Sequence, residues 1–118
     1  MTSLEQARRI AELAQEKLAK DIVILDMQGV CSYTDYFVVC TGANPRQTKA
    51  IWDEVHARLK QEAALLPSSA AGEREATWIV ADYLDVVLHV FTPEARAFYC
   101  LEDLWDDVPQ ESLAVATA

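Results

Sequence analysis

The sequence has few of the residues that mark disulfide-rich or metal-binding proteins. Its 118 residues include three cysteines, Cys31, Cys40 and Cys100, and no two of them form a C-x-x-C pair. An odd number of cysteines without such spacing does not predict a disulfide framework. Neither His56 nor His89 completes a zinc-ligand pattern with them. We therefore interpret the cysteines as reduced thiols and expect no metal and no cofactor.

Long hydrophobic runs are also missing. No apolar stretch approaches the ~18 residues that are needed to cross a bilayer. Residues 1–17 are amphipathic and carry both acids and bases, whereas a signal peptide has an apolar core. The apolar share is 52% and the charged share 25%, an ordinary globular composition. We expect one domain over residues 1–108, a disordered tail over residues 109–118, a cytoplasmic location and no membrane association.

Basic residues are scarce after residue 74. Residues 1–74 hold ten acids and nine bases, whereas residues 75–118 hold nine acids and one base, Arg96. Nearly all of the net charge of −9 therefore belongs to the C-terminal part. Such a surface repels the phosphates of nucleic acids, so we expect no direct DNA binding, and it attracts basic proteins. Solubility alone is the simpler interpretation of this charge.

Residues 77–91 are the most informative stretch of the chain. Two short apolar runs, 78–81 and 86–91, are rich in β-branched and aromatic residues, which is typical of strands. The four residues between them, 82–85, predict a hairpin with a four-residue turn. Because both runs are apolar at almost every position, we place this hairpin near the centre of a sheet that is covered on both faces.

Capping signals and periodicity predict three helices. Ser3 with Gln6 predicts the start of the first helix, which buries Leu18 at its end. Asn44 followed by Pro45 predicts the start of the second, which runs to about residue 64. Residues 92–94 repeat that signal for a short third helix. The side chains expected to face the core from the third helix and its continuation are Ala95, Phe98, Tyr99, Leu101, Leu104 and Trp105.

Two further strands complete the predicted fold. Residues 21–27 and 36–41 have strand composition, and the link 28–35 is too short for a crossover helix, so these strands form an antiparallel pair. Residues 67–72 are predicted to be a surface loop. The order of elements is α-β-β-α-β-β-α. It predicts an α/β fold of the mixed α+β kind, with a sheet of four to five strands flanked by helices.

An enzyme is the main alternative that these residues raise, because Asp35, Asp82, Asp85 and His89 could converge. A two-metal site for phosphoryl transfer needs carboxylates that hold ions ~4 Å apart. Asp82 and Asp85 stand at the two ends of a turn and need not share a face. The sequence has no Asp-x-Asp pair, no P-loop and no G-x-S-x-G motif. We therefore assign no catalytic residue and expect a protein that is not an enzyme.

Four patches in order resemble one known family. They are residues 34–39, residues 41–42 with Arg46 and Gln47, residues 78–91, and Arg96 with the aromatic positions that follow it up to Trp105. Together they resemble the ribosomal silencing factor family, also called the Iojap family. The resemblance covers residues 3–107. One departure is Leu84, because the family usually has glycine inside this D-[YL]-G-D turn, where glycine allows a positive φ.

The resemblance implies a fold and a function. Family members have a fold similar to the nucleotidyltransferase palm without its catalytic residues, and are typically homodimers in isolation. They bind ribosomal protein L-fourteen on the large ribosomal subunit, block joining of the small subunit and repress translation when nutrients are short. Organelle relatives assist assembly of the large subunit. A basic L-fourteen-type protein is a suitable counterpart for an acidic half-domain.

The hairpin is the expected partner-binding site. His89 also fits a packed, hydrogen-bonded strand histidine, and Trp78 and Tyr83 also fit core aromatics. Tryptophan and tyrosine are favoured interface anchors, so we expect truncation of Tyr83 to weaken binding. The residues expected to contact the partner are Trp78, Asp82, Tyr83, Leu84, Asp85 and His89.

Overall fold

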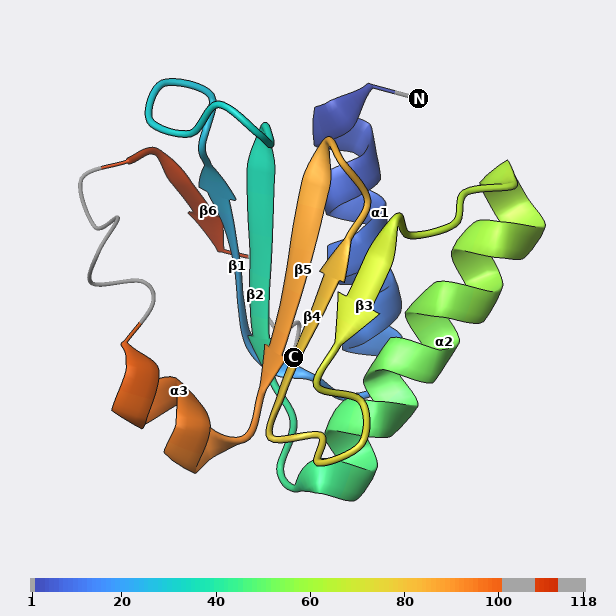
Figure 1. Cartoon of the computed structure of the whole chain (residues 1–118), viewed down its shortest axis with the longest axis vertical. Helices are drawn as coiled ribbons and strands as arrows, with labels where there is room; N and C mark the ends of the chain where they lie inside the picture. Colours follow the sequence, from blue (N-terminus) through green and yellow to red (C-terminus); the bar gives the residue numbers. More distant parts are fainter. Residues whose placement is uncertain (1, 101–107, 113–118) are drawn as a thin grey trace.

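The computed structural model describes residues 2–100 and 108–112, and its centre is one mixed sheet (Figure 1). The strand order is β3-β4-β5-β2-β1-β6. Helices α1 and α2 lie on one face of the sheet, and α3 lies on the other (Figure 1). The elements are α1 (Ser3–Glu16), β1 (Lys20–Asp26), β2 (Tyr36–Thr41), α2 (Pro45–Ala63), β3 (Ser69–Ala71), β4 (Trp78–Asp82), β5 (Val86–Phe91), α3 (Pro93–Tyr99) and β6 (Gln110–Ser112).

The predicted fold class is confirmed. The four predicted strands are the four inner strands of the sheet. β2 and β5 lie side by side in parallel, with Tyr36 opposite Val86 and Thr41 opposite Phe91. Every residue of both strands is buried, as expected for strands covered on both faces. The pair β1–β2 and the hairpin β4–β5 are antiparallel, as predicted.

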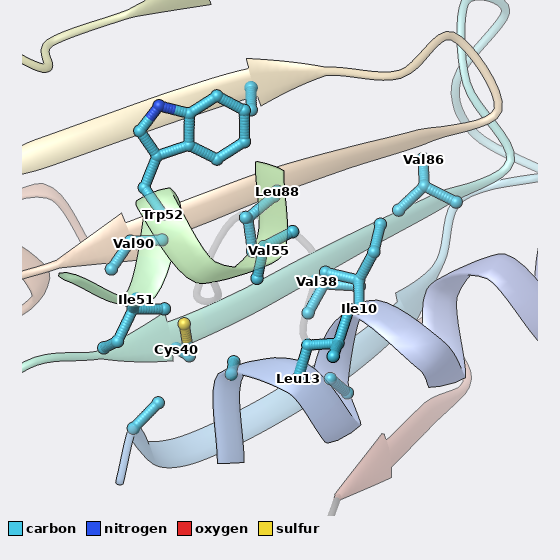
Figure 2. Close-up of a cluster of buried hydrophobic side chains, with 14 of the residues drawn as sticks. Ile10, Leu13, Val38, Cys40, Ile51, Trp52, Val55, Val86, Leu88 and Val90 are labelled. Carbon is cyan, nitrogen blue, oxygen red and sulfur yellow. The ribbon is translucent and has the colours of Figure 1, made fainter. Parts of the chain in front are cut away.

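The larger part of the core lies between the sheet and the two long helices. Figure 2 shows Ile10 and Leu13 of α1 and Ile51, Trp52 and Val55 of α2 above alternate side chains of the central strands. The side chains on the sheet-facing side of α2 are all buried. They are Thr48, Ile51, Trp52, Val55 and Leu59.

The ends of the helices are held by local hydrogen bonds. The predicted cap Asn44 accepts the backbone N–H of Gln47 at 2.9 Å. The side chain of Gln47 also donates to the carbonyls of Lys17 and Leu18, at 3.1 and 3.2 Å, and so joins the start of α2 to the end of α1. The first helix begins one residue early, because Thr2 with Glu5, and not Ser3 with Gln6, forms the capping box.

Leu18 is not buried, contrary to the prediction. It follows the end of α1 with a φ of 65° and is 74% exposed. Its N–H donates to Gln15 and that of Ala19 donates to Ala14, which is the hydrogen-bond pattern of a left-handed helix end. The helix therefore stops before its periodic pattern does.

Two short edge strands differ from the prediction. Strand β3 lies inside residues 67–72, which we expected to be a loop, and pairs with β4. Strand β6 lies inside residues 109–118, where we expected a disordered tail, and pairs with β1. Both strands have three residues. Both strands are held by hydrogen bonds to a neighbouring strand, so no hydrophobic periodicity within the segments themselves predicts them.

Helix α3 has the predicted cap and a different packing. Thr92 caps it and Pro93 is its first residue. None of its residues is fully buried, and Phe98 and Tyr99, which we expected to face the core, are 79% and 50% exposed. Ala95 is partly buried against the α3 side of the sheet. The expected contacts of Leu101, Leu104 and Trp105 lie outside the described residues.

In residues 2–100 and 108–112, no helix combines the length and the apolar character that crossing a bilayer requires.

We predict that Gly72→Ala lowers the free energy of unfolding by about 2–4 kcal/mol. Gly72 has a φ of +84°, and a Cβ atom there would overlap the carbonyl oxygen of Trp78, which belongs to the backbone of β4. Urea unfolding measures the effect. Gly29→Ala is the control, because nothing lies within 4 Å of its added Cβ. Equal stability of the two variants would contradict the described β3–β4 connection.

Candidate partner-binding surface on the hairpin

The hairpin residues that we expected to form one site lie in three places. Side chains alternate between the two faces along β4 and β5, so Trp78 and His89 lie on the face opposite α1 and α2, which we call the α3 face. Tyr83 lies on the helix side, in the main core. Leu84 and Asp85 form the exposed turn. Trp78 and Asp82 stand at opposite ends of β4.

Trp78 and His89 form one buried pair. The indole Nε1–H of Trp78 donates to Nδ1 of His89 at 3.2 Å. His89 is 5% exposed, and its ring meets that of Phe37 edge-on at 4.7 Å. Burial lowers the pKa of His89 to about 4, so the ring is neutral at physiological pH. The interpretation as a packed, hydrogen-bonded strand histidine is therefore confirmed.

A row of aromatic rings crosses the α3 face. Successive ring centroids lie 4.6 to 6.5 Å apart, within or close to the range of favourable aromatic pairs. Both ends of the row are exposed, with Tyr33 at 65% and Phe98 at 79%. We call it the aromatic row, and its members in order are Tyr33, Phe37, His89, Trp78, Tyr99 and Phe98.

Tyr83 is a core residue, and the expectation that it anchors a partner at the surface is wrong. It is 3% exposed, and its ring meets that of Trp52 on α2 edge-on at 6.2 Å. Its hydroxyl has no hydrogen-bond partner among the residues that the structure describes, and burial raises the pKa of Tyr83. The ring therefore contributes to the fold and not to the contact surface.

The turn itself is short and strained. Asp82 is the last residue of β4, opposite Val87, so the turn has three residues where we predicted four. Leu84 has a φ of 73°, and the N–H of Asp85 donates to the carbonyl of Tyr83 at 2.9 Å. This is the pattern of a γ-turn with positive φ, which is rare. Leucine in this region costs roughly 1–2 kcal/mol. The chain thus keeps the conformation that the family glycine allows.

Carboxylates surround the turn. Oδ1 of Asp82 accepts the N–H of Leu84 at 2.8 Å, so this side chain helps to hold the strained residue. The carbonyl of Asp85 accepts the N–H groups of Asp35 and Tyr36, which joins the turn to the loop before β2. The carboxylate of Asp85 is free to face solvent, because the residue is exposed and these bonds use its backbone. The result is an acidic sheet end.

Among the described residues, no group of three or more histidine, cysteine, aspartate or glutamate side chains is placed to hold a metal ion. The three cysteines are free thiols, and burial raises the pKa of Cys40 to about 12. Oδ1 of Asp26 accepts the N–H of Gln28 at 3.0 Å, which is a structural role.

Sequence reasoning missed Tyr33 and the contacts of Arg96, which both shape this surface. Tyr33 begins the aromatic row, and an aromatic residue in an otherwise polar loop was the available signal. Arg96 donates to the carbonyl of Asp21 and to Oγ1 of Thr41, both at 2.7 Å, and so fixes α3 to the sheet. No local signal could reveal these contacts, because the partners lie 75 and 55 residues away.

We predict that His89 makes the stability of the fold depend on pH. The unfolded chain binds a proton near the ordinary histidine pKa of about 6.5, whereas the folded chain binds it only near 4. The contribution of neutral His89 to the free energy of unfolding is therefore complete above about pH 6.5 and is lost as the pH falls toward 4. Between pH 7 and about pH 4.5 the wild type should lose about 2–3 kcal/mol more than His89→Gln, which does not titrate.

Urea unfolding of both proteins at the two pH values measures this difference, and the comparison cancels the titration of groups that the two share. An equal loss in both proteins would show that His89 is not held neutral in the fold.

Comparison with known proteins identifies the family. The family model described as "Ribosomal silencing factor during starvation" matches residues 1–118. The ribosomal silencing factor RsfS of Bacillus subtilis is 38% identical over 103 residues, 87% of this chain and 86% of that protein. A Mus musculus protein named mitochondrial assembly of ribosomal large subunit protein 1 is 31% identical over 101 residues, 81% of this chain and 43% of that protein. A crystal structure of a Chromobacterium violaceum protein matches with a TM-score of 0.84 and 29% identity, over 100% of this chain and 95% of that one. The chain belongs to the ribosomal silencing factor family.

Proposed function

We propose that this protein binds the large ribosomal subunit through a basic ribosomal protein of the L-fourteen type. Bound there, it blocks joining of the small subunit and represses translation when nutrients are short. The observation that carries the proposal is an acidic, aromatic-bearing sheet end in a chain that belongs to the ribosomal silencing factor family. The proposal is a binding role in the cytoplasm. It assigns no catalytic residue, no cofactor and no metal.

The charge of the surface supports a protein partner. Asp82 precedes the turn and Asp85 is its last residue, and Arg96, the one base after residue 74, donates to groups of its own chain. Opposite charges across an interface raise the rate of association and reject partners of the wrong sign. A basic protein surface satisfies this arrangement, whereas the phosphates of RNA do not.

The half-exposed aromatic residues extend the proposed surface from the acidic sheet end along the α3 face. Trp78 is partly exposed and is held in place by His89 and by the ring of Phe91, which stacks on it at 5.0 Å. A fixed aromatic ring loses little conformational entropy when a partner covers it. In this proposal Trp78, Leu84 and Asp85 touch the partner. Asp82 holds the turn, and Tyr83 and His89 support the surface from inside.

We predict that Asp85→Asn slows association with purified large subunits by about 2–5-fold at low salt and flattens the salt dependence. Interferometry measures the rates. Asp53→Asn is the matched control, because Asp53 is an exposed acid on α2, which covers the sheet face opposite Trp78 (Figure 1). A wild-type protein that fails to co-sediment with large subunits would refute the proposed function. Equal rates for Asp85→Asn and Asp53→Asn would refute the proposed surface.

Assembly of the large subunit is the second candidate function. The name of the Mus musculus relative favours it. Both roles need the same docking surface, so the variants above do not separate them. Depletion of the protein from growing cells separates the two roles. Depletion of an assembly factor leads to accumulation of precursors of the large subunit, whereas depletion of a silencing factor leaves mature subunits and changes translation only under nutrient limitation.

We also propose that the free protein is a homodimer. Phe98 and Tyr99 meet edge-on at 5.0 Å and are exposed together on α3, and exposed aromatic pairs of this kind are common in interfaces. We predict a mass of twice the 13.2 kDa chain by light scattering at high micromolar concentration, and a monomer for Phe98→Glu. A monomeric wild type at that concentration would contradict the proposal.

A further inference from the structure

The tip of the hairpin projects a leucine that its own chain does not use for packing. Leu84 is 63% exposed, one of the most exposed large apolar side chains in the described part of the chain. It has a φ of 73° at the centre of a γ-turn. Glycine would adopt this conformation without strain. Leucine at this position therefore strains the backbone and exposes an apolar side chain to solvent. Neither feature stabilises the fold.

The turn is held rigidly from every side. The N–H of Leu84 donates to Asp82 at 2.8 Å, and the N–H of Tyr83 donates to the carbonyl of Val86 at 2.9 Å. The ring of Tyr83 is buried in the main core. The carbonyl of Asp85 accepts two N–H groups from the start of β2. The backbone from which the Leu84 side chain projects is therefore fixed before any partner arrives, which lowers the entropic cost of binding.

The surroundings of the tip define the chemistry of its counterpart. Asp82 and Asp85 lie on either side of Leu84 in the chain, and the exposed ring of Tyr33 lies in the loop that hydrogen bonds join to the turn. An exposed leucine side chain between two carboxylates is complementary to an apolar depression that is bordered by lysine or arginine side chains. A nucleic acid would place phosphates next to these carboxylates, and the like charges would repel each other.

We propose that Leu84 is an apolar anchor that enters a depression on a basic protein surface and determines the affinity and specificity of the docking. The inference rests on the proposed function, since the occupant is the basic ribosomal protein on which the hairpin docks. The strained turn serves this contact: it carries leucine at a position that favours glycine, and it aims the side chain outward.

Replacing Leu84 separates its effect on binding from its effect on folding. Leu84→Gly removes both the side chain and the strain, so its thermal midpoint equals or exceeds that of the wild type by a few degrees. Leu84→Asn keeps a residue that tolerates the left-handed region and replaces the apolar group with a polar one. Both variants should bind purified large subunits about tenfold or more weakly, mainly through faster dissociation.

The chain offers a matched control in Leu18. It is also an exposed leucine with a positive φ, 74% exposed at 65°, but it stands at the end of α1 beside the start of α2. The hairpin turn lies at the other end of the sheet, where β2 and β5 begin. Leu18→Gly should therefore shift the thermal midpoint in the same direction as Leu84→Gly and leave binding unchanged.

Interferometry against large subunits, against the purified basic ribosomal protein and against naked ribosomal RNA distinguishes the outcomes. Loss of binding by both Leu84 variants on the subunit and on the protein supports the inference. Wild-type affinity in both variants, while the wild type binds, overturns the inference and leaves the proposed function intact. A loss seen on naked RNA alone overturns the assignment of a protein occupant. A wild type that binds no subunits overturns the proposed function and the inference together.

Discussion

The parallel pairing of β2 with β5 is the constraint on which the rest of the structure depends. Parallel neighbours cannot be joined by a tight turn, so the chain returns through α2, β3 and β4 before it enters β5. The pairing also brings the start of both strands to the same end of the sheet. The loop before β2 and the hairpin turn meet there, and the carbonyl of Asp85 accepts the N–H groups of Asp35 and Tyr36. The acidic sheet end is a consequence of this topology.

The two faces of the sheet are used differently. Aliphatic side chains of α1 and α2 fill the space above one face, as in an ordinary close-packed core (Figure 2). The α3 face carries the aromatic row, and in the described part of the chain α3 adds no fully buried residue to it. Arg96 fixes this helix through two polar contacts. A face that is ordered but only partly covered is suited to contact with another protein, because its rings are already in position.

Leu84 keeps its strained backbone conformation because neighbouring contacts fix the rest of the turn. The buried ring of Tyr83, the carboxylate of Asp82 and the two strands each fix part of the turn, and together they hold Leu84 at a positive φ. Such strain is kept where neighbouring contacts over-determine the backbone. In this chain the same contacts aim the most distinctive residue of the turn at solvent.

The sequence by itself determined the elements whose signals are local: the caps at Asn44 and Thr92, the strands β2 and β5, the antiparallel hairpin and the excess of acid after residue 74. Each follows from a few adjacent side chains and their preferred backbone conformations. The mixed fold class followed from the order of these elements, and the family followed from four patches of residues that resemble it.

Only the tertiary structure decided which hairpin residues face outward. Tyr83 is buried because Trp52, about thirty residues earlier in the chain, lies above it, and His89 is buried because Phe37 and Trp78 surround it. Strands β3 and β6 exist because neighbouring strands offer them hydrogen bonds. In each case the physical reason is the same: the partner that fixes the residue is distant in the chain, so no local pattern can encode it.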